Sequence, residues 1–314
     1  MYDNSWFIDC HIHVSLNGIN IKDWRRTLLE QNFKPISEIL DQYKRRNVLI
    51  IRDGGDNQGA TLAAREMAEQ KGIIYKSPGW AIYKAGRYGG IIGRPVNDIR
   101  DFKDVFNELL KIKPDHLKVV LTGLVDFESY GEVGGISFSY EELYYIVQTA
   151  KEKELPVMVH VNSSEAVKMA VEAGVDTIEH GYFIEDEVLH MMAEREVIWV
   201  PTLAPLGNIL EDEKLRHKYR NQLQNIERAY MRQLETVKRA YELGVKIAVG
   251  SDAGAVGVYH AQGFFDEVRH LKKCGIPEDQ VLRMSSENGL KALNVGPSEL
   301  KLLKKSIQQN NKEF

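Results

Sequence analysis

The sequence predicts an α/β fold in which eight parallel strands and the helices between them form a (β/α)8, or TIM, barrel. Strand-like apolar runs alternate with amphipathic segments along the chain, which is the pattern of repeated β/α units. The runs are nearly continuous in Val, Ile and Leu, as strands buried on both faces require. A length of 314 residues is long for one ordinary domain but common for such a barrel.

The expected elements follow one another in regular order. We expect strands at residues 7–14, 48–54, 73–80, 116–123, 156–162, 177–181, 197–203 and 246–252. Amphipathic segments lie between strands, for example at 37–46, 60–70, 102–112, 140–151, 165–173 and 185–193. Ser139 with Glu142 forms a capping box, Ser163 precedes another helix, and Gly174 stands where that helix should stop. The segment 278–314 is expected to be a helical tail, and residues 1–314 one domain.

Three connections are longer than the others. They cover residues 81–96, 124–138 and 204–222, and each follows an expected strand. Active sites of such barrels lie at the carboxyl ends of the strands, so these loops are expected to act as lids or specificity elements.

Composition excludes several classes of partner. Lys and Arg number 41 and Asp and Glu 45, which gives a net charge of −4. No basic stripe with interleaved aromatic residues is present, so we expect no nucleic-acid partner. No apolar run of about 18 residues occurs, so we expect no membrane span. Two cysteines far apart in the chain, Cys10 and Cys274, and the lack of a signal peptide favour the cytoplasm.

Polar residues at the expected strands indicate a metal site. His11 and His13 are two positions apart in the first strand, so their side chains point to the same face. Further candidate ligands lie in or at the end of the fourth, fifth, sixth and eighth strands, namely Lys118, His160, His180 and Asp252. Each alone would read as a core residue or an ion-pair partner. Six such residues within five strands or at their carboxyl ends favour metal binding instead.

The ligand types allow two divalent ions. His11, His13 and Asp252 offer two nitrogens and an oxygen to one ion, and His160 and His180 offer two nitrogens to a second. Lys118 cannot ligate as an ammonium. A neutral, buried amine could ligate, or it could react with carbon dioxide to form an anionic carbamate that bridges two metals. Zn²⁺ fits nitrogen and oxygen ligands best, while Mn²⁺, Fe²⁺ and Co²⁺ are chemically allowed.

The ordered ligand set resembles the binuclear class of the amidohydrolase superfamily. The surrounding phrases are similar to its imidazolonepropionase-like and prolidase-like branch, over residues 7 to about 295: Phe138-Ser-Tyr-Glu-Glu-Leu143, Ile178-Glu-His-Gly181, Val200-Pro-Thr-Leu203 and Gly244-Val-Lys-Ile-Ala-Val-Gly-Ser-Asp-Ala-Gly254. The resemblance implies that Lys118 is the carboxylated bridging lysine. It also implies that Asp252 is both a metal ligand and the catalytic proton shuttle.

The chain departs from the branch in two respects. Many members carry a small β-sandwich built from segments before and after the barrel. The sequence motif typical of that sandwich is missing here, so we expect a barrel-only member. Dipeptidases of the branch often have an aromatic residue where this chain has Asn162. Asn162, Tyr83, Arg87 and His260 are the expected substrate contacts, and Lys84 is an alternative to Arg87 for binding a carboxylate.

The predicted activity is hydrolysis of an amide, cyclic amide or peptide C–N bond in a small-molecule substrate, by water activated at the metals. A lactonase or phosphotriesterase is an alternative, because the phrase from Leu117 to Gly123 resembles that group. A deaminase is disfavoured by Lys118, since deaminases often lack the lysine. A non-catalytic metal-binding protein would not require the complete ligand set. A homo-oligomer is possible.

Overall fold

The computed structural model describes residues 6–310 and has an α/β architecture. Its strands are β1 (Phe7–Ile12), β2 (Val48–Asp53), β3 (Ile74–Lys76), β4 (Ala81–Lys84), β5 (Gly93–Val96), β6 (Leu117–Val120), β7 (Val157–Val161), β8 (Thr177–His180), β9 (Ile198–Val200) and β10 (Lys246–Ile247). Its helices are α1 (Ile21–Leu29), α2 (Lys34–Arg45), α3 (Ala60–Gln70), α4 (Ile99–Lys111), α5 (Tyr140–Lys151), α6 (Ser164–Ala173), α7 (Asp186–Glu194), α8 (Ala204–Glu211), α9 (Glu213–Lys218), α10 (Leu223–Glu242), α11 (Gln262–Lys273), α12 (Glu278–Arg283), η1 (Met284–Asn288), α13 (Gly289–Ala292) and α14 (Pro297–Asn310).

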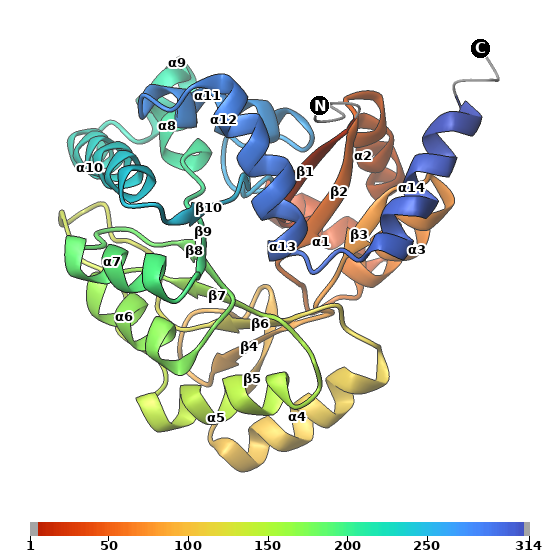
Figure 1. Ribbon diagram of the computed structural model, residues 1–314, viewed down its shortest axis with the longest axis horizontal. Coiled ribbons are helices and arrows are strands. Elements are labelled where there is room, and N and C mark those ends of the chain that lie inside the picture. The colour runs from red at the N-terminus through yellow and green to blue at the C-terminus, as the bar shows by residue number, and fades with distance from the viewer. Residues whose placement is uncertain (1–5, 311–314) are drawn as a thin grey trace.

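The strands form two parallel sheets that lie edge to edge. The first has the order β1-β2-β3 and the second the order β10-β9-β8-β7-β6-β4-β5. The chain just after β10 joins the free edge of β1, where Cys10 N donates to Val249 O and Asp252 N donates to His11 O, over 2.9 and 2.7 Å. Helices surround the strands in Figure 1. The result is a TIM-barrel-like fold, and full closure of the ring stays a prediction.

Each of the eight expected runs contains a strand. The prediction of a loop at residues 81–96 was wrong in part. Residues 81–96 hold β4 and β5 at their two ends, and β4 takes the place beside β6 in the sheet. Ala81 and Ile82 are buried there, and Ile82 pairs with Val119. Five glycines lie between residues 79 and 93, and such a glycine-rich segment is typical of a loop rather than a strand.

The connection at 204–222 was also expected to be a loop, and instead it contains α8 and α9. Leu206 and Ile209 of α8 are buried against the core, and Asp212 caps α9 by accepting a hydrogen bond from Leu215 N at 2.9 Å. The exposed charged residues of this segment lie at the end of α8 and in and beside α9, which explains why its second half resembles a polar loop in the sequence.

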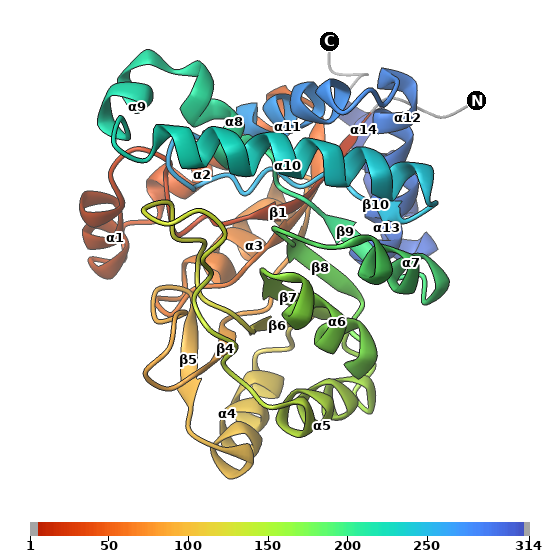
Figure 2. The ribbon, with the colours of Figure 1, turned by 90° about the vertical axis from the view of Figure 1, so that its left-hand side faces the viewer.

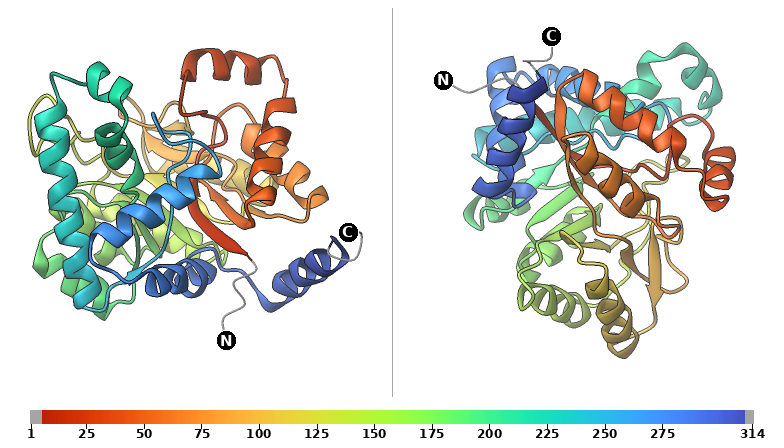
Figure 3. Two further views of the ribbon diagram at one scale, coloured as in Figure 1. Left: turned by 90° about the horizontal axis from the view of Figure 1, so that it is seen from above. Right: turned by 90° about the vertical axis from the view of Figure 1, so that its right-hand side faces the viewer.

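The local helix signals were read correctly. Ser139 and Glu142 form a reciprocal capping box at the start of α5, Ser163 caps α6, and Gly174 ends α6 with a φ of 87°. The expected tail becomes α12, η1, α13 and α14, and Figure 3 shows α14 at the periphery of the molecule. Within residues 6–310, no helix has the length and apolarity needed to cross a bilayer.

Loops that follow strands gather at one end of the molecule. Figure 2 shows α1, α9 and the loop between β6 and α5 on the left, and α13 and α14 on the right. The left-hand end is the carboxyl end of strands such as β1, where active sites of such barrels lie.

Candidate metal centre

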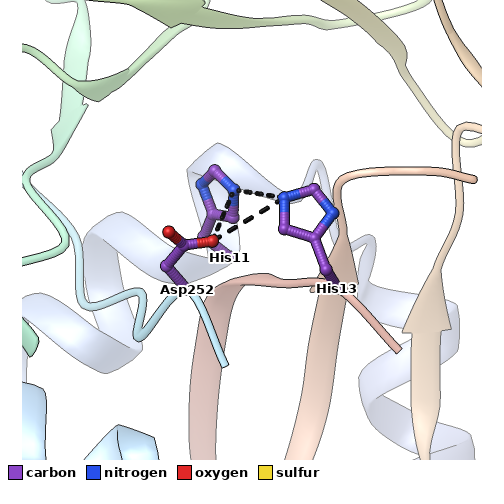
Figure 4. A group of neighbouring side chains, drawn as sticks. All are labelled: His11, His13 and Asp252. Carbon is purple, nitrogen blue, oxygen red and sulfur yellow. Dashed lines mark hydrogen bonds and ion pairs between the residues drawn. The ribbon is translucent and has the colours of Figure 1, made fainter. Parts of the chain in front are cut away.

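His11, His13 and Asp252 bring three ligand atoms to one point (Figure 4). The two Nε2 atoms are 3.3 Å apart, and Asp252 Oδ1 lies 3.6 Å from His11 Nε2 and 3.7 Å from His13 Nε2. The two histidines come from the end of β1, and Asp252 follows β10 on the adjoining edge. Two nitrogen lone pairs and a carboxylate oxygen directed at each other fit a shared divalent cation.

The backbone at this point is fixed by a buried carboxylate. Asp9 accepts hydrogen bonds from Ser251 N at 2.9 Å and Ser251 Oγ at 2.6 Å. Asp252 itself has a φ of 56°, in the left-handed region, which costs free energy unless neighbouring contacts impose it. The contacts at Asp9 therefore hold Asp252 against the first strand.

A charged pair lies behind His11. The pair consists of Glu179 and Arg52. His11 Nδ1–H donates a hydrogen bond to Glu179 Oε2 over 2.6 Å, and Arg52 Nη2 donates to Glu179 Oε1 over 2.7 Å. Both side chains are fully buried. A carboxylate on Nδ1 fixes the tautomer that leaves the Nε2 lone pair facing the site, as in many metal-binding histidines.

His160 and His180 form the second half of the cluster. Their ring centroids are 4.7 Å apart, and the His180 ring lies 4.9 Å from that of His11. His180 Nδ1 lies 2.7 Å from Thr202 Oγ1, and His160 Nε2 lies 3.4 Å from Gly123 O. One nitrogen of each ring is thus engaged by the protein. The other has no hydrogen bond among the residues that the structure describes, so it could bind a metal.

All four histidines are held neutral. Burial lowers the pKa of His13 and of His160 to about 3, and the Lys118 charge adds to this effect. Burial also places the pKa of His11 and His180 well below the usual value. Neutral imidazoles at pH 7 are the form that binds metal.

Lys118 lies in β6 with its amine buried and unpaired. The residue is 1% exposed, and within residues 6–310 its Nζ has no hydrogen-bond partner. Burial lowers the pKa of the amine to about 8. The lowered pKa leaves part of the amine neutral and reactive near pH 7. An ammonium without a partner is unfavourable in such a place, so the surroundings fit an anionic derivative of the amine that contacts a cation.

Asp252 is placed to exchange a proton near neutral pH. Burial raises the pKa of its carboxyl to about 7, and the positive charge of Lys118 opposes that rise. A carboxyl that titrates near pH 7 suits a general acid–base role.

The expected substrate contacts lie in different surroundings. Arg87 is exposed, and its Nη1 lies 3.9 Å from the point where a Cβ on Gly135 would stand. Tyr83 lies directly under Gly89, where a Cβ would stand 2.5 Å from the Tyr83 Cβ. Lys84 is paired with Glu142 at 2.5 Å. Of the two cationic candidates, Arg87 is therefore the one without an ion-pair partner within residues 6–310.

Asn162 and His260 are engaged by the protein itself. Asn162 Nδ2 donates to Gly123 O over 3.3 Å, and its Oδ1 accepts from Tyr182 N over 3.4 Å. His260 Nε2 donates to Leu16 O over 2.8 Å, and its Nδ1 lies 3.2 Å from the Tyr43 hydroxyl. Their contact with substrate stays a prediction.

Sequence reasoning missed the supporting residues. Glu179, Arg52 and Thr202 were not selected, although each is polar within or beside a buried strand. Tyr88 was also missed as a site residue, yet its ring centroid lies 5.4 Å from that of His160. Gln233 and Trp199 donate to the carbonyl of His180, whose φ is 66°. Only contacts between distant segments reveal these roles.

Fold and site together define a TIM-barrel-like protein with a candidate metal cluster at the carboxyl ends of its strands. The chain belongs to the Amidohydrolase family, which matches residues 7–298. Family membership confirms the superfamily predicted from the ligand order.

Among curated relatives, an uncharacterized protein of Mycobacterium tuberculosis is 30% identical over 145 residues. That match covers 46% of this chain and 39% of the relative, so the chain spans well under half of it.

Two solved structures show the same fold. One is a Xaa-Pro dipeptidase with bound methionine, with 21% identity, a TM-score of 0.73 and coverage of 93% of this chain and 75% of that one. The other is ochratoxinase of Aspergillus niger, with 16% identity, a TM-score of 0.73 and coverage of 94% and 72%. At these identities the likeness concerns the fold alone.

Proposed function

We propose that this protein is a metal-dependent hydrolase that cleaves an amide, cyclic amide or peptide C–N bond. The observation that supports this most is the convergence of His11, His13 and Asp252 within 3.7 Å. The amine of Lys118 acts electrostatically on this group and has no hydrogen-bond partner within residues 6–310. The fold is shared with proteins named for peptide or amide substrates, including a Xaa-Pro dipeptidase. Catalysis at this cluster would place the reaction at the carboxyl end of the strands.

Two divalent ions are the proposed cofactors. His11, His13 and Asp252 would hold one and His160 and His180 the other, with Zn²⁺ the expected metal. Bound metal would supply Lewis acidity for the carbonyl and for a water molecule at neutral pH.

Lys118 is proposed to carry a carbamate. Its amine, in the neutral form, would add to the carbon of carbon dioxide: the N–C bond would form as one C–O π bond opens onto oxygen, and a proton would pass from the nitrogen to solvent, leaving an anionic carbamate on Nζ. A negative group at this buried position would compensate the positive charge of two cations, which a bare ammonium would oppose.

The protein's own groups would then handle the proton and the geometry. Asp252 would take a proton from the attacking water and deliver it to the leaving nitrogen. Glu179 would hold the His11 ring in one tautomer, and Thr202 would hold the His180 ring.

The test is a substrate panel with the full-length protein loaded with Zn²⁺ or Mn²⁺. It contains dipeptides, N-acyl amino acids, cyclic amides, lactones, phosphotriesters and aminated heterocycles. We expect metal-dependent cleavage of a C–N amide bond, lost in His13→Ala and kept in His217→Ala, a substitution of an exposed histidine in α9. Faster turnover of lactones or phosphotriesters than of every amide, or no turnover of the whole panel, would overturn the proposal.

A further inference from the structure

The loops around the candidate metal centre expose large apolar side chains. They are Tyr88 at 38%, Ile91 at 41%, Tyr259 at 46%, Leu124 at 55% and Ile19 at 72% exposure, and we call these five residues the apolar rim. The other large exposed hydrophobic residues of the described chain, Leu29, Tyr140, Tyr144, Met231 and Leu302, all lie on helices. Apolar exposure on loops is therefore concentrated at the carboxyl end of the strands.

The rim loops that follow the first and last strands are joined to each other. Gly18 N donates to Gly254 O over 3.0 Å, and Gly257 N donates to Gly18 O over 2.9 Å. His260 ties the loop of Tyr259 to Leu16 through the bond of its Nε2. Ile19 and Tyr259 thus belong to two loops with a fixed relation to each other.

The turn between β4 and β5 is anchored by Arg25 of α1 and by Asn57. Arg25 donates to Ile91 O over 3.1 Å and to Asn57 Oδ1 over 2.9 Å, and Asn57 in turn donates to Gly90 O. Gly89 has a φ of 137° and lies on Tyr83, so neither its backbone nor its surroundings accept a side chain. The turn therefore presents Tyr88 and Ile91 in a set position.

Tyr88 connects the rim with the metal centre. It is exposed to solvent and also lies 5.4 Å, ring to ring, from His160. A molecule whose reacting group meets His160 would therefore lie close to Tyr88, and an extension of it toward solvent would reach the rim loops. Apolar surface next to a reaction centre is most favourably covered by an apolar part of the ligand itself.

We infer that the substrate carries a large apolar group on one side of the scissile amide bond, which the apolar rim covers during binding. The inference rests on the proposed hydrolytic function and names its substrate class: N-acyl amino acids or related amides with an aliphatic or aromatic arm. Small hydrophilic dipeptides would leave the rim in water and are poor substrates.

Chain-length series test this inference. The full-length, metal-loaded enzyme is assayed with N-acyl glycines from acetyl to octanoyl, and with N-acetyl derivatives of glycine, valine, leucine and phenylalanine, below their aggregation limits. A methylene that leaves water completely contributes about fourfold to kcat/KM, so half burial gives about twofold. If the acyl group is the part that the apolar rim covers, we expect kcat/KM to increase roughly 60-fold over the six methylenes between acetyl and octanoyl.

Rim variants give the structural readout. In Tyr88→Ser and in the double variant Ile91→Ser/Tyr259→Ser, the ratio of octanoyl to acetyl activity should fall by at least about fivefold. Leu302→Ser is the matched control, because Leu302 is exposed to 67% on α14, away from the rim. That variant should leave the ratio unchanged.

The outcomes are distinguishable. Amide hydrolysis with a flat profile in both series overturns the inference and leaves the proposed function intact. A second contrary outcome is a flat profile in a protein that forms a dimer, where the rim variants dissociate the dimer. The apolar rim would then be a contact between copies of the chain, and the inference on the substrate would be overturned. If no member of either series, and no other amide, is hydrolysed, the proposed function fails and the inference with it.

Discussion

Replacing Glu179 by glutamine tests how strongly the buried charge behind His11 controls the metal centre. Glu179→Gln keeps the size of the side chain but removes its charge. It leaves the Arg52 guanidinium buried beside a neutral amide, and the amide NH2 group can turn toward His11 Nδ1. The tautomer of His11 is then no longer imposed.

The expected magnitudes follow from burial and from the remaining contacts of Arg52. Removing one partner of a buried ion pair costs about 3–5 kcal/mol. Arg52 keeps acceptors at Cys10 O, Thr177 Oγ1 and Ala292 O, so we expect a loss of unfolding free energy near the lower end, about 3 kcal/mol. Loss of the carboxylate on a metal-binding histidine should weaken metal affinity by about 10–100-fold.

The assays are urea unfolding of the metal-free protein and competition for Zn²⁺ against a chelator. Glu187→Gln serves as the control, because Glu187 forms an exposed ion pair with Lys168 at 2.9 Å and should change neither quantity measurably. A double-mutant cycle with Arg52→Met separates the pair from its surroundings. Unchanged stability and unchanged metal affinity in Glu179→Gln would refute the role given to this pair.

Three further predictions concern single residues. Lys118→Ala should lose most of its bound metal by elemental analysis, and added acetate should restore part of it; full metal content without acetate would contradict the carbamate. Asp252→Asn should keep part of the metal but lose about a hundredfold or more in turnover, and near-normal turnover would remove Asp252 from the mechanism. Glu267 is buried, which raises the pKa of its carboxyl from 4.5 to about 8, so its favourable contribution is present below pH 4.5 and is lost as the pH rises to 8. Relative to Glu267→Gln, the wild type should therefore lose up to about 5 kcal/mol of unfolding free energy between pH 4.5 and 8, and parallel pH profiles in urea unfolding would contradict this.

The fold could be predicted where the sequence pattern is local. Apolar runs, the capping box at Ser139 and the glycine at 174 follow from neighbouring residues alone, and the structure has strands and helix ends there. Strand β4 could not be found this way. Its burial against β6 depends on a strand that lies more than 30 residues further along the chain.

The candidate site follows the same division. Alternation along a strand puts His11 and His13 on one face, and the structure places both beside Asp252. The supporting residues depend on long-range contacts: Glu179 reaches His11 across 168 positions, and Arg52 reaches Glu179 across 127. The positive φ of His180 depends likewise on Gln233 and Trp199, which hold its carbonyl from α10 and β9.

The central claim is a site for two divalent ions built on a carboxylated Lys118. Elemental analysis of the full-length protein, purified without chelator in bicarbonate buffer and supplemented with Zn²⁺, tests it most directly. The account predicts close to two ions per chain in the wild type and a clear loss in Lys118→Ala. One ion or none per chain, unchanged by added metal and the same in both proteins, would contradict it.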